Sequence, residues 1–129
     1  MFLHELNNEQ KEAFICLAHN VVVSDGELTP DEQLMMDQLK REIGLARDFE
    51  PHYIPVEGIE NIFDTRKSRV ATIIAMIRLG YADGAFEIEE QFLLKDICKA
   101  FEVSDKDFVI IENWVRRLIA LEKEASSFM

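Results

Sequence analysis

The fold is decided by residues Asp25 to Glu32, which read DGELTPDE, and by residues Asp83 to Glu90, which read DGAFEIEE. A shift of 58 positions places the first stretch over the second, and the Asp, Gly and final Glu residues are then identical. The apolar residues recur in kind, with Leu28 over Phe86, Leu39 over Ile97 and Ile43 over Phe101. Each copy has the pattern of a helix, an Asp-Gly turn and a second helix. The chain is therefore predicted to contain a duplicated helix–turn–helix unit.

Apolar residues at intervals of three and four extend outward from both stretches, as in amphipathic helices, and no segment shows the alternation of a strand. Thr29-Pro30 followed by Glu32 is typical of a capped helix start, and Gly44 of a helix end. We expect residues 1–129 to form one domain, since domains commonly contain roughly 100–150 residues. The predicted repeat units cover about 8–45 and 66–103, the connector covers 46–65, and the C-terminal helix covers about 105–125.

Duplicated helical hairpins often pack about an approximate two-fold axis, because the same apolar faces are available to both. We therefore expect an all-α bundle with pseudo-two-fold symmetry, in which the two Asp-Gly turns occupy related positions. The last helix is expected to pack through a single apolar stripe, made of Phe108, Ile111, Trp114, Val115, Leu118 and Leu121.

The formal net charge of −11 limits the partners that the chain can take. It argues against nucleic acid and against an anionic membrane surface, and it favours cations, basic proteins or simple solubility. Cys16 and Cys98 show no CxxC spacing and lie among apolar residues, so we expect two buried thiols in a reducing compartment. With no predicted signal peptide or membrane-spanning run, we expect a cytoplasmic protein without direct membrane insertion.

The Asp-Gly motif has a purely structural interpretation. Gly takes the positive φ that redirects the chain after a helix, and Asp hydrogen-bonds nearby amides of the turn. Leu28 and Phe86 would fill the core between the helices, and Glu32 would complete a capping box with Thr29.

A calcium-binding EF-hand loop fits only in part. Gly26, Leu28 and Glu32 match the sixth, eighth and twelfth positions of such a loop, but the first and third positions are Val21 and Val23. In the second copy, the first and third positions are Leu79 and Tyr81. Apolar side chains cannot coordinate calcium, so neither loop is predicted to be a working EF-hand by itself.

A cation site shared by the two copies is an alternative to one EF-hand in each copy. Asp25, Glu32, Asp83 and Glu90 would concentrate negative charge if the pseudo-two-fold axis brings them together. A divalent cation bound through oxygen would relieve the repulsion between these carboxylates. Calcium or magnesium suits such ligands better than zinc, which prefers His and Cys.

Residues 22–32 and 79–90, which contain the paired motifs, resemble the signatures of the TerB-like family, which includes tellurite-resistance TerB proteins and the related domain of DjlA-type co-chaperones. The resemblance covers roughly residues 14–103. It implies a compact bundle of about six to seven helices with an internal duplication. It also implies an acidic metal site at Asp25, Glu32, Asp83 and Glu90, and a role in stress response in bacteria.

Two functions are therefore predicted. The first is a TerB-like domain that binds a divalent cation, calcium or magnesium, through the paired motifs. The alternative is a metal-free acidic module, of co-chaperone or adaptor type, that docks on a basic protein or in a membrane-associated complex. No nucleophile with a placeable base and no phosphate-binding loop is present in the sequence, so we do not expect an enzyme.

Overall fold

The computed structural model describes residues 2–24, 28–46, 48–81 and 88–129, with the backbone alone for residues 88–90. These residues form five α-helices and two short 3-10 helices, and none of them lies in a strand. The α-helices are α1 (Asn8–Val22), α2 (Pro30–Ile43), α3 (Arg66–Gly80), α4 (Ile88–Ala100) and α5 (Asp105–Ser126), and the 3-10 helices are Leu3–Glu5 and Ile59–Asn61. The all-α prediction is confirmed. The count is five α-helices instead of six to seven, because the connector and the N-terminal segment form only single 3-10 turns.

The duplication is visible in the helix bounds. A shift of 58 positions moves Asn8–Val22 onto Arg66–Gly80 and moves Pro30, where α2 begins, onto Ile88, where α4 begins. The residues that end α1 and α3, Val23 and Tyr81, have the same backbone conformation, with φ near −95° and −90° and ψ of 4° in both. The residues that cap α1 and α3 are also equivalent: Asn7 and Thr65 each accept a backbone hydrogen bond through a side-chain oxygen.

The ends of α2 and α4 repeat the same hydrogen bonds. Leu45 N donates to Lys40 O, and Val103 N donates to Cys98 O, both at 2.9 Å. These are the bonds of a Schellman motif, in which the residue that ends the helix takes a left-handed conformation. That residue is Gly44 in the first copy, with φ 79°, and Glu102 in the second, with φ 59°.

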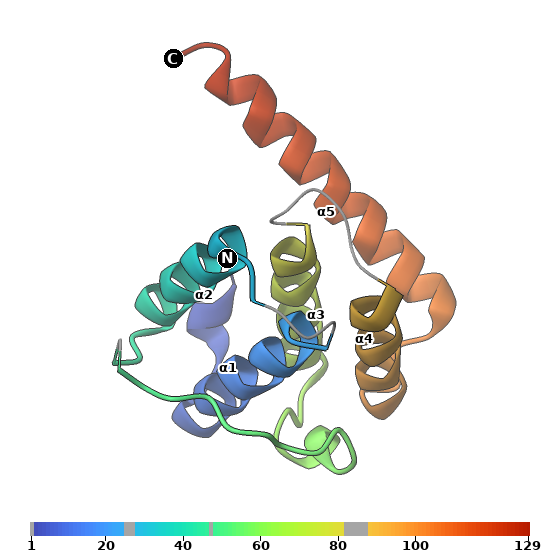
Figure 1. Ribbon diagram of the computed structural model, residues 1–129. Helices are drawn as coiled ribbons and strands as arrows, with labels where there is room; N and C mark the ends of the chain where they lie inside the picture. The colour runs from blue at the N-terminus through green and yellow to red at the C-terminus, as the bar shows by residue number, and fades with distance from the viewer. Residues whose placement is uncertain (1, 25–27, 47, 82–87) are drawn as a thin grey trace.

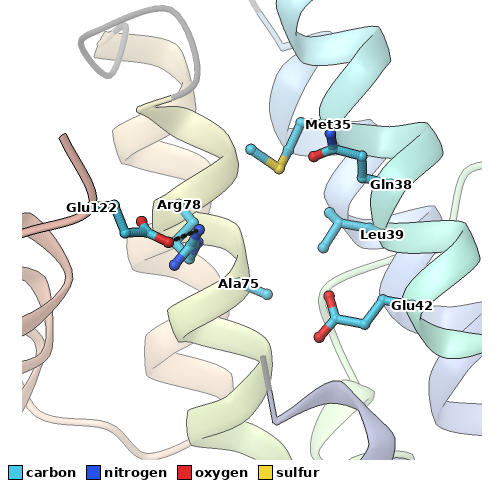
Figure 2. A pocket seen from close by; sticks show the side chains of 7 residues that line it. All are labelled: Met35, Gln38, Leu39, Glu42, Ala75, Arg78 and Glu122. Atoms are coloured by element: carbon cyan, nitrogen blue, oxygen red, sulfur yellow. Dashed lines mark hydrogen bonds and ion pairs between the residues drawn. The ribbon is translucent and has the colours of Figure 1, made fainter. Parts of the chain in front are cut away.

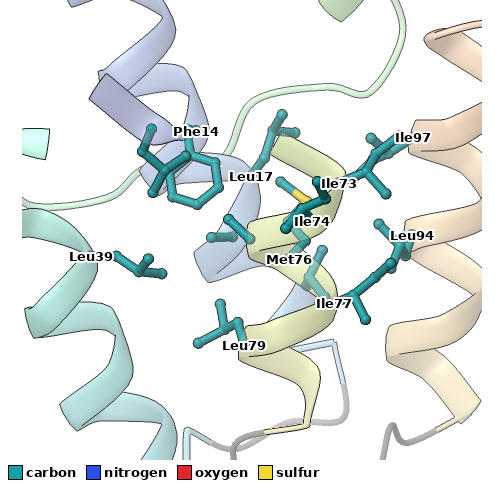
Figure 3. Packing of buried hydrophobic residues seen from close by; sticks show 14 of the residues in the cluster. Phe14, Leu17, Leu39, Ile73, Ile74, Met76, Ile77, Leu79, Leu94 and Ile97 are labelled. Carbon is teal, nitrogen blue, oxygen red and sulfur yellow. The ribbon is translucent and has the colours of Figure 1, made fainter. Parts of the chain in front are cut away.

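Helices α1 and α3 form the centre of the bundle and contact each other, while α2 and α4 lie on opposite sides of them (Figure 1). α1 contacts both α2 and α4, and α3 contacts both α4 and α2. These contacts are unchanged when the first helical pair is exchanged with the second, as an approximate two-fold axis requires. Figure 3 shows the apolar side chains from α1, α2 and α4 that converge on α3, among them Phe14, Leu39 and Leu94.

The connector between the two copies is held by one arginine at the start of α3. Arg69 donates from Nε to Phe63 O at 2.6 Å, from Nη2 to Glu60 O at 2.9 Å and from Nη1 to Phe101 O at 3.3 Å. Phe63 and Phe101 pack edge to face, with their ring centroids 5.4 Å apart. The end of the connector is thereby tied to the end of α4.

α5 is only loosely covered by the bundle. Val115 is its one fully buried residue, and its C-terminal end projects beyond the other helices (Figure 1). The predicted single packing stripe is therefore wrong at its end, because Leu121 is 60% exposed. Leu121 lies on the solvent-facing side of α5, whereas its neighbour Glu122 forms an ion pair with Arg78 of α3.

Cys16 and Cys98 are both buried and unpaired, as predicted. Burial raises the pKa of the Cys98 thiol to about 12, and the nearby Asp105 acts in the same direction. Across the residues that the structure describes, no helix is both long and apolar enough to cross a membrane.

Candidate functional site

Glu32 is the predicted ligand whose side chain the structure describes. Its Oε1 accepts a hydrogen bond from Thr29 N at 3.1 Å, and its own N–H donates to Thr29 Oγ1 at 3.1 Å. This reciprocal pair is the capping box that the sequence predicts. The side chain is buried: Glu32 is 3% exposed and is the one buried acidic residue among those whose burial is described.

The other three predicted ligands are not described to the same extent. Asp25 and Asp83 lie outside the described residues, and for Glu90 the structure gives only a backbone position in the first turn of α4. Within the described part of the chain, no group of three or more His, Cys, Asp or Glu side chains is arranged to hold a metal ion. The shared site at Asp25, Glu32, Asp83 and Glu90 stays a prediction.

The positions that fail as EF-hand ligands have a structural role. Val21 and Leu79 are fully buried in α1 and α3, and Val23 and Tyr81 are the residues at which these helices end. The segment before each Asp-Gly turn is thus helix packed in the core, which leaves no loop of EF-hand type there. Leu28 packs against the same core, as the structural interpretation of the motif predicts.

A small polar cleft lies between α2, α3 and the outer part of α5 (Figure 2). Its volume is about 160 Å³, and it is lined by Met35, Gln38, Leu39, Glu42, Ala75, Arg78 and Glu122. Arg78 Nη2 lies 3.2 Å from Glu122 Oε2, and Arg78 Nη1 is buried without a hydrogen-bond partner among the described residues. Sequence reasoning did not find this cleft, because its residues come from three helices that no motif connects.

A second hollow lies beside the connector. Cys16 Sγ is 3.6 Å from His52 Nδ1, and Glu9 and Glu12 line the same hollow. His52 is exposed, whereas Cys16 is 1% exposed at the base of the hollow. The pair fixes the connector against α1, and Asn20 Nδ2, which donates to Ile54 O at 3.2 Å, adds a second attachment.

The bundle and its duplicated helices define the class of protein: an acidic all-α domain built from two equivalent helical pairs. Residues 56–113 match the family described as tellurite resistance protein TerB. This match over residues 56–113 supports the TerB-like assignment made from the two motifs. The matched region contains α3, the whole second motif and α4, and the first motif is related to it by the 58-residue repeat. Neither a curated protein nor a solved structure matches the chain.

Proposed function

We propose that this TerB-like domain binds a divalent cation, calcium or magnesium, through Asp25, Glu32, Asp83 and Glu90. The observation that supports the proposal most is the burial of Glu32, at 3% exposed in a chain whose other described acidic residues lie at least partly in solvent. Burial of a carboxylate is costly unless it is compensated, and among the described residues the Glu32 carboxylate accepts from one backbone N–H, that of Thr29. A cation beside the Asp-Gly turn would supply the rest.

The capping role and the cation role of Glu32 are separable by one substitution. Glu32→Gln keeps an oxygen that can accept from Thr29 N, since Gln serves as well as Glu in a capping box. The same change removes the negative charge that a cation needs. We expect the Gln variant to melt close to the wild-type temperature without metal and to lose the stabilisation by metal.

The experiment is thermal unfolding of the intact chain with EDTA and with a series of calcium or magnesium concentrations. A cation present at 100 times its Kd stabilises the folded state by about 2.7 kcal/mol, which raises the melting temperature by several degrees. Glu57→Gln, at an exposed acid of the connector, is the matched control and should keep the full shift. A wild-type chain whose melting temperature is the same in EDTA and in millimolar calcium or magnesium would contradict the proposal.

A metal-free interaction module is the second candidate, and the cleft between α2, α3 and α5 favours it. Its two carboxylates, Glu42 and Glu122, outnumber the single guanidinium of Arg78, so the cleft has a net negative charge. A volume of about 160 Å³ is below the range of small-molecule pockets, and it suits one side chain of a basic partner. Binding of a lysine-rich peptide that weakens with salt and with Glu122→Gln, but not with EDTA, would support this function. A peptide that binds equally well to the Glu122→Gln variant would count against it.

A further inference from the structure

α5 and the residues just after it have exposed apolar side chains that the described part of the chain does not cover. Ile110, Leu121 and Phe128 are 57%, 60% and 80% exposed, respectively. The helix has 22 residues, about 33 Å, and Figure 1 shows that its C-terminal end projects beyond the bundle. Isolated helical turns are marginal in water, because helices gain most of their stability by packing an apolar face. A partner on this face would therefore stabilise the outer turns.

The exposed residues follow a heptad spacing. Intervals of four and three alternate along a seam that lies beside the side chains facing the bundle, such as Val115. Trp114 belongs to the seam and also packs partly against the core. Two of the seam residues, Arg117 and Glu124, carry opposite charges. A third, Trp114, is partly covered by Phe2 of the same chain, and the centroids of the two rings are 6.4 Å apart. The seam consists of Ile110, Trp114, Arg117, Leu121, Glu124 and Phe128, of which Phe128 lies in the turn that follows α5.

The charge on α5 points to a second copy of this chain as the partner. The helix has five acidic and four basic residues, a net charge of −1, whereas the whole chain has a net charge of −11. Two copies of a strongly acidic protein repel each other least where they meet through nearly neutral surfaces. A basic partner, in contrast, would gain more from the acidic remainder of the molecule.

We propose that two copies of the chain associate through this seam, with their α5 helices antiparallel about a two-fold axis near Leu121. Each Arg117 then lies beside the second copy's Glu124, and the two Leu121 side chains meet at the axis. The same register places the second copy's Phe128 over a hollow lined by Ile110, Asn113, Arg116 and Arg117. Residues spaced three to seven apart on one helix form the holes that receive such apolar knobs in helix pairs. Because the two chains are related by a two-fold axis, each of these contacts occurs twice in the dimer.

The first experiment measures the mass of the intact chain in solution by sedimentation equilibrium and by light scattering. We expect a concentration-dependent dimer. Leu121→Asp and Phe128→Asp should each raise the dimer dissociation constant at least about tenfold, since each buries a charge in the apolar centre of the interface. Val109→Asp, at a residue of the same helix that is 52% exposed and off the seam, is the matched control and should leave the constant unchanged.

The second experiment uses the charged pair and distinguishes a second copy from any other partner. Arg117→Glu alone and Glu124→Arg alone place like charges opposite each other, so each variant should be monomeric. An equal mixture of the two variants should form a heterodimer, because every opposed pair is then complementary, and the double variant should recover the homodimer. Circular dichroism checks that each exposed substitution leaves the helix content unchanged.

A wild-type chain that is monomeric at about 100 μM, a hundred times a micromolar dissociation constant, would overturn the proposal. A dimer that the seam variants leave intact would overturn it as well, as would a dimer disrupted instead by charge at Leu34 or Phe92, the exposed apolar residues at equivalent places on α2 and α4.

Discussion

The first and second helical pairs share the length and cap of their first helix and the closing hydrogen bonds of their second, but they differ in the segment that follows each pair. α2 ends at Gly44 and is followed by a connector with little regular structure, whereas α4 ends at Glu102 and leads directly into the long helix α5. The elements inside each pair are set by a local sequence pattern that the duplication preserved. The segments after each pair have no common pattern, and there the two copies have diverged in sequence and in structure.

The largest expected difference between the copies lies in the core residue next to each helix end. Ile43 and Phe101 occupy equivalent positions and are 3% and 1% exposed. Phe101→Ala should lower the free energy of unfolding by about 3–5 kcal/mol, and Ile43→Ala should cost less, within the lower part of about 2–5 kcal/mol. Phe101 additionally loses its edge-on contact with Phe63 and the Arg69 guanidinium, which lies 5.9 Å from the centre of its ring. Urea unfolding of the two variants measures the difference, and equal losses would contradict it.

Gly44 and Glu102 are the left-handed residues that follow α2 and α4, and substitutions at these two positions should change the stability of the fold in opposite directions. Glu102 adopts φ 59°, a conformation that costs a non-glycine residue about 1–2 kcal/mol, so Glu102→Gly should stabilise the fold by up to about 1 kcal/mol. Gly44→Ala should destabilise it by about 1 kcal/mol. The cost is one of backbone conformation, since a Cβ at Gly44 would meet no atom within 4 Å.

Chemical denaturation of the two variants measures both effects. Compared with wild type, the midpoint should rise for Glu102→Gly and fall for Gly44→Ala. A destabilised Glu102→Gly variant would show that the Glu102 side chain contributes more than its backbone conformation costs.

A smaller difference concerns a histidine in the first copy. His19 occupies the place of the buried Ile77, and burial, with a further contribution from Lys40, lowers the pKa of His19 below 6.5. The unfolded chain therefore takes up this proton at a higher pH than the folded chain does. The folded state should lose stability as the pH falls through 6.5 towards the lowered pKa. His19→Ile, which copies the second repeat, should reduce this loss in unfolding curves measured between about pH 7 and pH 5, the range in which an ordinary histidine titrates. An unchanged pH dependence would contradict the assignment.

Local signals predicted most of the fold. Thr29-Pro30, Gly44 and the 58-residue repeat located the helices to within one or two residues, because caps and apolar spacing act through neighbouring positions in the sequence. The outer half of α5 was not predicted correctly. The apolar spacing of Trp114, Val115 and Leu121 shows that a helix has apolar sides, but it does not show which side the rest of the chain covers.

The sequence predicted the local role of individual site residues, but not which of these residues the fold brings together. The capping role of Glu32 follows from its place three positions after Thr29 and is confirmed. Whether it lies near Glu90 depends on the packing of two helices that are far apart in sequence. The cleft containing Arg78 and Glu122 depends in the same way on helices α3 and α5, and no spacing in the sequence connects them.

The most direct test of the central claim, that the two motifs form one cation site, is a calorimetric titration of the intact chain with calcium and with magnesium. We expect one cation bound per chain, and we expect Glu32→Gln in the first copy and Glu90→Gln in the second to abolish the same binding event. Two independent binding events, each lost in only one variant, or no binding at millimolar metal, would contradict the claim.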